Sequence, residues 1–553
     1  MAGQVGSAAL ADAARRMRIL FVMASPEFLR FYDSTIRLLA ERGHHVLLAV
    51  NKQPDAKPVR LEHLDAAGRV EALGLVPRRD DAWTPMARLV RGAMDYARYL
   101  HPRFAEAPAL RQRLARKGLP PSLRGVDARL GTFGDGTVRR LIGGLQTLER
   151  GIPVSPAIEQ FLAQHRPDVV VVSPLVDVGS DQVDVVRAAR RLGIRVVAAI
   201  ASWDNLTNKG LLRVQPDAVL VWNEAQKHEA IEMHGVPAER VIVTGAQLFD
   251  KWFGRQPARS LEAFTSRVGL PSAERFILFT GSSMFISAPE REVPFVKRWV
   301  EVLRGSAHAA LRDAPILIRP HPYNGWIWAD VDMSAYPNVA VWPRGRYNPV
   351  DADERNDFFD SLYYSRAVVG INTSAMVEAA IVGRPVHSIV TDDFASTQEG
   401  TLHFHHLLPE HGGFLQIGRG FDHHMSLLAA SLADEAGARE QTQRFVAWFL
   451  RPHGLDQACT PLVADALAQV RTAPPLPDDG AAVITRTLAR TLRPLANALM
   501  RRSGERDGAS LSERWRKARA KSRKRMDRAA KTANKRARQM RKGVRVWLKD
   551  FGA

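Results

Sequence analysis

Short apolar runs rich in β-branched residues recur along this chain and alternate with patterns typical of amphipathic helices. The first series consists of the runs at 19–24, 46–50, 168–172, 195–200 and 218–222. A continuous apolar run followed by a helix is typical of a parallel strand that is covered on both faces. The series therefore predicts a lobe built around a parallel sheet.

A second series of the same kind follows, and the two meet near residues 250–272. Its runs lie at 276–279, 315–318, 339–341, 367–369 and 385–386. The chain of 553 residues is also longer than one hydrophobic core supports, which is about 250 to 300 residues. We predict an α/β protein with two Rossmann-like lobes, residues 17–255 and 256–470, and a cleft between them. Ligands of such sheets bind beyond the carboxyl ends of the strands.

Four further segments lie outside this alternation. Residues 1–16 form an N-terminal extension. Residues 83–161 carry helical spacing rich in Arg and Leu, which predicts a helical insertion in the first lobe with its arginines on a solvated face. Residues 471–510 contain a proline-rich linker and a short amphipathic helix. Residues 511–553 are predicted to form a basic amphipathic tail helix.

The chain has a single cysteine, Cys459. This excludes an intramolecular disulfide framework and a cysteine-based zinc cluster, and it agrees with a reducing compartment. No apolar run approaches the roughly 18 to 20 residues of a membrane-spanning helix. We therefore expect any membrane contact to be peripheral.

Most of the net charge of +20 lies in the tail, where 17 Lys and Arg between Arg514 and Lys549 face one acid, Asp527. Such cations around a thin apolar stripe are drawn to anionic lipid. An anionic membrane surface is the expected partner of residues 511–549, rather than nucleic acid. A basic helix that follows phosphates without reading sequence and a solvated charged helix are the alternatives.

Two loops of the second lobe suit a diphosphate. Gly281, Ser282 and Ser283 end the first strand of that lobe, and small residues there let the backbone approach phosphate. The next strand ends in Arg319 and His321, each followed by a proline that stiffens the loop. Arginine can hold phosphate with two parallel hydrogen bonds. A tight turn and the capping of neighbouring carbonyls are the alternative interpretations.

A third loop carries Asn372, Thr373 and Ser374 at the start of a predicted helix, with Glu378 one turn later. Hydroxyls and amides at such a position suit a phosphate or pyrophosphate. The Glu378 carboxylate could accept hydrogen bonds from two ribose hydroxyls. An N-cap followed by an exposed acid is the alternative interpretation.

The order of these three loops, followed by Gly383-Arg384-Pro385, resembles the donor lobe of GT-B enzymes. The closest likenesses are capsular and surface-polysaccharide glycosyltransferases and CDP-glycerol glycerophosphotransferases. The segment 223–250 also resembles the passage between lobes in UDP-N-acetylglucosamine 2-epimerases. The resemblance covers roughly residues 17–470. It implies a nucleoside diphosphate in the second lobe, with Glu378 at the ribose and Thr373 and Ser374 at phosphate.

In the first lobe a dense polar loop, 202–210, follows the strand that ends at residue 200. Asp204 is the first candidate for the base that removes the proton of an acceptor hydroxyl. His321 is the competing base, and an Asx-turn is the alternative for Asp204. The predicted acceptor side of the cleft also includes Ser25, Trp203, Asn205, Asn208 and Lys209.

The segment 398–406 contains three histidines. No carboxylate pair completes a metal shell at this spacing, so we predict no metal site and no cofactor beyond a nucleotide-sugar co-substrate. Gln398, Thr401 and His403 are instead predicted to donate hydrogen bonds into the cleft.

These observations predict a glycosyltransferase that moves a sugar from a nucleotide diphosphate sugar to a hydroxyl of a surface-polysaccharide or lipid-linked acceptor. We expect it to be inverting, metal-independent, cytoplasmic and peripheral on the inner face of the plasma membrane. The alternatives are a CDP-glycerol-type glycerophosphotransferase, a UDP-sugar 2-epimerase-like enzyme, and a non-catalytic GT-B scaffold at the membrane.

Overall fold

The computed structural model describes residues 16–52, 64, 68–127, 130–322, 324–345, 351–478 and 483–507. The chain divides into two compact units, residues 1–81 with 87–489 and residues 82–86 with 490–553. Both sheets belong to the first unit. Nearly all of the predicted N-terminal extension and the whole of the predicted tail helix, 511–553, lie outside the described residues.

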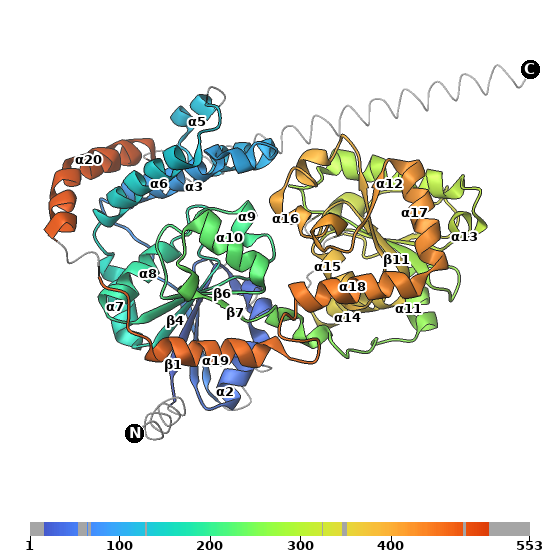
Figure 1. Ribbon diagram of the computed structural model, residues 1–553, viewed down its shortest axis with the longest axis horizontal. Helices are drawn as coiled ribbons and strands as arrows, with labels where there is room; N and C mark the ends of the chain where they lie inside the picture. The colour runs from blue at the N-terminus through green and yellow to red at the C-terminus, as the bar shows by residue number, and fades with distance from the viewer. Residues whose placement is uncertain are drawn as a thin grey trace, which may run out of the picture. The chain divides into compact units, whose positions relative to one another are not determined.

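The first sheet has seven strands, all paired in parallel, in the order β3-β2-β1-β4-β5-β6-β7 (Figure 1). The strands are β1 (Arg18–Met23), β2 (His45–Val50), β3 (Val70–Leu75), β4 (Val169–Ser173), β5 (Arg195–Ala199), β6 (Ala218–Val221) and β7 (Val241–Val243). At its centre Leu20 lies between Leu47 and Val170. The central strands are buried on both faces, which explains their continuous apolar runs.

The second sheet has six strands, also parallel, in the order β10-β9-β8-β11-β12-β13. The strands are β8 (Phe276–Thr280), β9 (Ile316–Arg319), β10 (Val339–Val341), β11 (Ser365–Gly370), β12 (Val386–Val390) and β13 (Gln416–Arg419). Counted from the first strand of its lobe, each sheet contains the order 3-2-1-4-5-6, which is that of the Rossmann fold. The predicted α/β class and two Rossmann-like lobes are confirmed.

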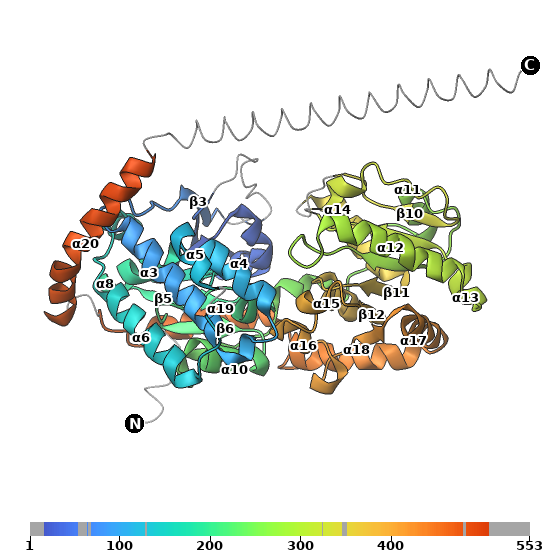
Figure 2. The same cartoon turned by 90° about the horizontal axis from the view of Figure 1, so that it is seen from above.

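Helices cover the first sheet on both faces and also fill the region of the predicted insertion. The helices of the lobe are α2 (Asp33–Glu41), α7 (Pro156–His165), α8 (Gln182–Arg191), α9 (Asn205–Asn208) and α10 (Glu224–His234). Between β3 and β4 the chain forms α3 (Thr84–Ala97), α4 (Pro108–Gly118), α5 (Pro121–Asp127) and α6 (Asp135–Arg150). Figure 2 shows α4 and α6 with the first lobe.

The arginines of the insertion do not all lie on a solvated face, which differs from the prediction. Arg91 is buried and its guanidinium contacts Glu149 at 2.8 Å and Asp184 at 2.7 Å. Because Asp184 belongs to α8, this buried ion pair joins the insertion to the body of the lobe. An arginine fork can satisfy two carboxylates at once, which permits its burial.

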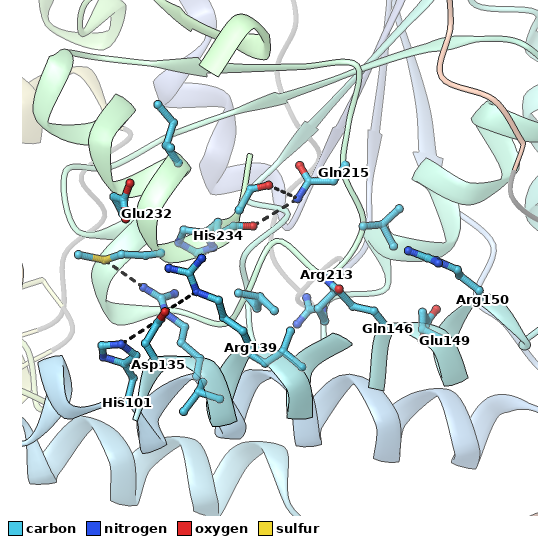
Figure 3. A pocket seen from close by; sticks show the side chains of 18 of the residues that line it. His101, Asp135, Arg139, Gln146, Glu149, Arg150, Arg213, Gln215, Glu232 and His234 are labelled. Atoms are coloured by element: carbon cyan, nitrogen blue, oxygen red, sulfur yellow. Dashed lines mark hydrogen bonds and ion pairs between the residues drawn. The ribbon is translucent and has the colours of Figure 1, made fainter. Parts of the chain in front are cut away.

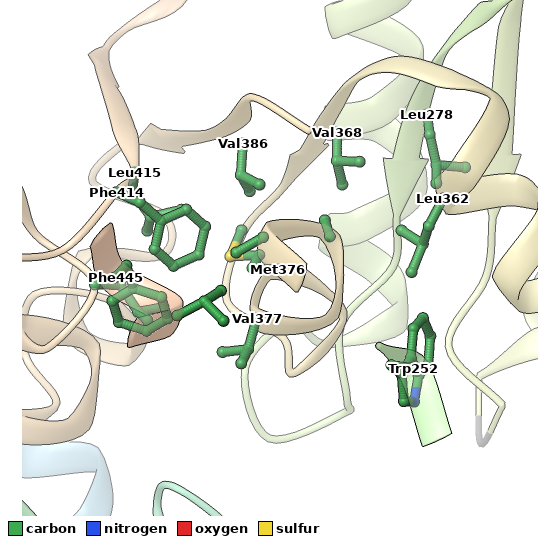
Figure 4. Close-up of a cluster of buried hydrophobic side chains, with 14 of the residues drawn as sticks. Trp252, Leu278, Leu362, Val368, Met376, Val377, Val386, Phe414, Leu415 and Phe445 are labelled. Atoms are coloured by element: carbon green, nitrogen blue, oxygen red, sulfur yellow. The ribbon is translucent and has the colours of Figure 1, made fainter. Parts of the chain in front are cut away.

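Eight helices accompany the second sheet in the described part of the chain. They are α11 (Leu261–Val268), α12 (Pro289–Arg304), α13 (Ala309–Arg312), α14 (Ala352–Tyr364), α15 (Ala375–Ile381), α16 (Leu402–His405), α17 (Phe421–Ala433) and α18 (Glu435–Phe449). Figure 4 shows Met376 and Val377 of α15 packed among Val368, Val386 and Phe445. Burying such side chains stabilises the fold by roughly 1.5–3 kcal/mol each. This packing fixes α15, which carries Glu378 one residue further on.

The chain returns to the first lobe in α19 (Cys459–Thr472). Val463 and Leu467 share a buried cluster with Ile36 and Leu39 of α2. This segment was predicted to belong to the second lobe, 256–470, because an apolar helical face does not reveal which sheet it covers. The last described helix is α20 (Val483–Asp507). Among the helices that the structure describes, none combines the length and apolar character needed to cross a bilayer.

Candidate functional site

A cavity of about 750 Å³ lies at the carboxyl ends of strands from both sheets. It is lined by the loop after β5 in the first lobe and by the loops after β8, β9 and β11 in the second. Strands β8 and β11 are neighbours at the point where the strand order of their sheet reverses, which is where ligands of such folds bind. The predicted site residues that line the cavity are Trp203, Asp204, Asn208, Lys209, Gly281, Ser283, Arg319, His321, Asn372, Thr373, Ser374, Glu378 and His403.

The other five predicted residues do not line this cavity. The Ser25 hydroxyl bonds to Glu27, and the Asn205 side chain accepts a hydrogen bond from the amide of residue 201 at 3.2 Å. Ser282 is buried. Gln398 Nε2 donates to the carbonyls of residues 371 and 389, and Thr401 Oγ1 donates to the Gln398 carbonyl at 2.8 Å. Gln398 and Thr401 therefore hold the backbone together, which differs from the prediction that they face the cleft.

The loops after β8 and β9 pack backbone against backbone. The Gly281 amide donates to the Arg319 carbonyl at 2.8 Å, and a Cβ at Gly281 would lie 2.8 Å from the His321 amide nitrogen. The Ser282 amide donates to Glu292 Oε2 at 2.8 Å, so this amide is already satisfied within the protein. Burial raises the pKa of Glu292 to about 7. Glu292, which lies in α12 after the loop, was not among the predicted site residues.

Trp203 joins the predicted acceptor side of the site to the predicted donor side. Its Nε1 donates to Ser374 Oγ at 3.1 Å, immediately before α15. Its ring packs edge-on against His403, with centroids 4.7 Å apart, and His403 Nε2 lies 3.4 Å from Asn372 Nδ2. The loop that follows β11 is therefore contacted at Ser374 by a side chain of the other lobe.

Asp204 is held in its ionised form. Ser202 Oγ donates to Asp204 Oδ1 at 2.7 Å, and Asn208 Nδ2 lies 3.4 Å from Oδ2. Burial alone would raise the pKa of Asp204, but Lys209, His403 and these hydrogen bonds outweigh it and hold the pKa below its usual value. A carboxylate in this position can orient a hydroxyl and accept its proton.

Two histidines of the cavity are neutral at physiological pH. Burial, with a smaller contribution from Arg30, lowers the pKa of His321 to about 4. Burial also lowers the pKa of His403 to about 4, although Asp204 opposes the shift. A neutral imidazole has one nitrogen that can accept a proton, so His321 meets the basic requirement of a competing base.

Glu378 is a desolvated carboxyl that lines the cavity. Burial raises the pKa of Glu378 to about 7, and the positive charges of Arg30 and Lys251 only partly offset this. Across the described part of the chain, no hydrogen bond or ion pair engages its carboxylate. A buried acid without donors is costly, and hydroxyl groups of a ligand would supply them.

Positive side chains outnumber negative ones in the lining, by eight to four. The cations are Arg30, Arg37, Arg113, Lys209, Lys251, Arg255, Arg319 and Arg355, and the acids are Asp33, Asp204, Glu354 and Glu378. An excess of cations in a concave site attracts anions such as a diphosphate. Glu378, in the first turn of α15, is one of the few acids in this cationic lining. Its carboxyl suits a neutral hydrogen-bond donor of a ligand, such as a hydroxyl group.

Six cations of the lining were not among the predicted site residues: Arg30, Arg37, Arg113, Lys251, Arg255 and Arg355. Lys251 Nζ bonds to Asp33 Oδ2 at 2.9 Å, and the Arg113 guanidinium lies 4.5 Å from the ring of Phe285 in the loop after β8. Arg30 lies on the same loop as Ser25, and Lys251 follows the segment 223–250. The sequence therefore pointed to the segments that carry these cations. It did not show that their side chains reach the cavity.

The three histidines of segment 398–406 point to different partners. His405 Nε2 contacts the Glu399 carbonyl at 2.7 Å, and His406 Nε2 contacts Glu229 Oε1 at 2.6 Å. His403 lies against Trp203. Within the described ranges, no group of three or more His, Cys, Asp or Glu residues is arranged to hold a metal ion.

Neither a protein-family model nor the sequence of a curated protein matches this chain. Solved structures that resemble it include the UDP-GlcNAc 2-epimerase from Methanocaldococcus jannaschii, which is 14% identical, covering 81% of this chain and 99% of that one, with a TM-score of 0.44. The calicheamicin glycosyltransferase CalG4 is 15% identical, covering 83% and 100%, with a TM-score of 0.41. A variant of the wall teichoic acid polymerase TagF is 11% identical, covering 83% and 90%, with a TM-score of 0.41. At identities this low the likeness does not identify the reaction of this chain.

Proposed function

We propose that this chain is a GT-B glycosyltransferase that moves a sugar from a nucleotide diphosphate sugar to a hydroxyl of a surface-polysaccharide or lipid-linked acceptor. One observation carries the proposal: the desolvated Glu378 carboxyl, without hydrogen-bond donors of its own, lines a cavity that is otherwise rich in cations. A nucleoside diphosphate offers both complements, since its ribose has hydroxyl donors and its diphosphate is anionic.

The donor is held by the second lobe in this proposal. The ribose hydroxyls donate to Glu378, and the Thr373 and Ser374 hydroxyls together with Arg319 bind the diphosphate. Charge-assisted hydrogen bonds of this kind are about twice as strong as neutral ones. Side-chain cations of the lining supply positive charge to the leaving diphosphate, so the transfer is proposed to be metal-independent.

The acceptor hydroxyl oxygen attacks the anomeric carbon of the sugar. The bond between that carbon and the diphosphate oxygen breaks, and the nucleoside diphosphate leaves with the bonding electrons. Asp204 takes the proton of the hydroxyl, with His321 as the competing base. Attack from the face opposite the leaving group inverts the configuration. Asp204 suits the role because it lies in the cavity in its ionised form.

A thermal-shift screen with UDP, GDP, CDP, CMP and dTDP tests the donor site, because a ligand that binds only the folded state raises its stability. We expect one nucleotide to stabilise the protein and Glu378→Ala to weaken its binding about 10- to 150-fold. That range corresponds to the loss of charged hydrogen bonds worth about 1.5–3 kcal/mol. Glu262→Gln, an exposed residue of α11, is the matched control.

Unchanged affinity in Glu378→Ala would refute the ribose assignment, and no response to any nucleotide would favour a non-catalytic scaffold. Product analysis then separates the reactions. Release of a nucleoside diphosphate with a glycosylated acceptor supports the proposal. Release of CMP would instead indicate a glycerophosphotransferase, and an epimerised nucleotide sugar without acceptor would indicate an epimerase.

We further propose that the enzyme works in the cytoplasm, peripherally on the inner face of the plasma membrane. The support is the cluster of Lys and Arg in residues 511–549, which lies outside the described residues. Such cations contribute about 1 kcal/mol each near an anionic surface. Full-length protein should sediment with vesicles that contain phosphatidylglycerol, and a chain ending at residue 510 should not. Equal sedimentation of the two would contradict this location.

A further inference from the structure

A second cavity, of about 630 Å³, lies within the first lobe (Figure 3). Its walls come from the segment 98–104 and from α6 of the insertion on one side. The lobe itself contributes α8, α10 and the loop that leads to β6. None of the residues that line it also lines the cleft described above. The proposed transfer reaction makes no use of it.

Arginine dominates the lining of this second cavity. Seven arginines line it against four carboxylates, and Figure 3 shows Arg139, Arg150 and Arg213 among them. Some of these arginines are structural. Arg213 is paired with Asp95 at 2.6 Å, and Arg187 is paired with Glu149 at 3.3 Å.

At the end of the cavity formed by Arg98, His101 and Arg103, the positive charge is not matched by acids. Considering only the residues that the structure describes, no carboxylate lies within ion-pair distance of Arg98 or Arg103. Asp135 pairs with Arg139 at 2.6 Å and with His101 at 3.3 Å, and Glu232 contacts Arg103 through its backbone carbonyl at 3.5 Å. This end of the cavity therefore has a surplus of cations.

Arg98 is the buried cation at this end of the cavity. Its side chain is buried and donates only to backbone carbonyls and a sulfur atom, while its Nε has no hydrogen-bond partner. Burial lowers the pKa of Arg98, which means that the environment disfavours its charge. The charges of Glu229 and Asp95 offset this cost only in part, and an anion in the cavity would offset more of it.

We propose that this cavity is a second binding site, for a phosphate-bearing ligand whose phosphate contacts Arg103 and lies beside Arg98 and His101. Guanidinium groups bind phosphate oxygens through paired hydrogen bonds. The lining also includes the apolar side chains of Val138, Ile142 and Ile231, which suit a carbon skeleton attached to the phosphate. The ligand class is thus a phosphorylated sugar or a phosphorylated lipid.

The site lies directly behind the loop that carries Asp204. Arg98 donates to the carbonyls of Leu206 and Gly210, the latter at 2.8 Å, and His234 Nε2 contacts the Leu206 carbonyl at 2.8 Å. Both side chains also line the second cavity. A ligand bound there would therefore touch the residues that hold the loop of the proposed base.

Hydrogen–deuterium exchange of the full-length protein with and without pyrophosphate tests the site. At a concentration about ten times Kd, exchange that requires ligand release slows about tenfold. We expect this protection at residues 98–104, 135–142 and 231–235. The double variant Arg103→Gln, Arg139→Gln should lose it, whereas Arg116→Gln should keep it. Arg116 is an exposed arginine of α4 outside both cavities.

Protection at 281–286 and 371–378 reports the cleft separately, so a failed donor site and a failed second site are distinguishable. The proposal is overturned if pyrophosphate leaves 98–104, 135–142 and 231–235 unprotected, or if the double variant keeps their protection. Two further probes assign the source of the phosphate. Protection of the same segments by glucose 1-phosphate supports a soluble ligand, and protection by phosphatidylcholine vesicles containing phosphatidic acid supports a lipid headgroup.

Discussion

Replacing Glu378 with glutamine should make the unliganded protein more stable at neutral and alkaline pH. Burial raises the pKa of Glu378 from 4.5 to about 7, so its charged form is disfavoured in the folded state. Glutamine has nearly the same shape and carries no charge. The substitution therefore removes the cost of ionisation and leaves the packing of α15 unchanged.

The sign and size follow from proton linkage. Because the folded chain holds the Glu378 proton more tightly than the unfolded chain, stability is lost as the pH rises from about 4.5 to about 7 and is constant above that. Each unit of pKa shift corresponds to about 1.4 kcal/mol. Allowing for partial exposure, we expect Glu378→Gln to gain about 2–3 kcal/mol above pH 7 and almost nothing near pH 4.

Differential scanning calorimetry over a series of pH values measures this difference. The entropy of unfolding is about 2.1 cal/mol/K per residue. The gain in stability should therefore raise the Tm by about 5–7 °C if the second lobe unfolds alone, and by about 2–3 °C if the whole chain unfolds as one unit. Glu262→Gln, which is exposed, should show no such pH-dependent gain. An increase in Tm that is equal at low and high pH, or no increase at all, would show that the Glu378 carboxyl is not desolvated.

Two further substitutions test the loop of the first lobe. Asp204→Asn should lower kcat by about 10²- to 10⁴-fold in steady-state kinetics. Calorimetric titration should show unchanged nucleotide affinity. A larger loss of kcat in His321→Gln would assign the base to His321 instead. Arg98→Met should remove donors from the buried backbone of loop 202–210, at a cost of about 1–3 kcal/mol for each unsatisfied carbonyl. We expect faster hydrogen exchange in that loop and a lower kcat with unchanged nucleotide affinity, and an unaltered exchange rate would argue against a positioning role for Arg98.

The central strands could be predicted from the sequence and the edge strands could not. β1, β4 and β8 are covered on both faces, so their apolar runs are continuous. β3, at the edge of its sheet, has one buried residue in six, and β7 has only three residues. A strand that is half-exposed or this short has too few apolar residues to stand out from a loop.

The parts of the site that could be predicted are those that follow strands. Thr373 and Arg319 come directly after or at the end of strands of one parallel sheet, so their proximity follows from topology. Arg30 and Lys251 reach the cavity from the short 3-10 helices Pro26–Phe31 and Gln247–Trp252, and their placement depends on how these helices pack around the cleft. Gln398 was predicted to face the cleft only because its side chain is polar. Its amide instead donates to backbone carbonyls within the lobe.

The helical insertion is best understood as part of the machinery that orders the loop of the proposed base. Tyr99 Oη lies 3.1 Å from the Thr207 carbonyl and 2.7 Å from the Lys209 carbonyl and can donate its one proton to either, and Arg98 donates to the Gly210 carbonyl in the same loop. Without these donors the loop would leave several carbonyls unsatisfied in a buried place, which would favour other conformations. Arg98 also lines the arginine-rich cavity. A ligand in that cavity would therefore contact a residue that positions the loop of Asp204. An anion bound there would then change the rate of the proposed transfer without contacting the donor, which is what a regulatory site requires.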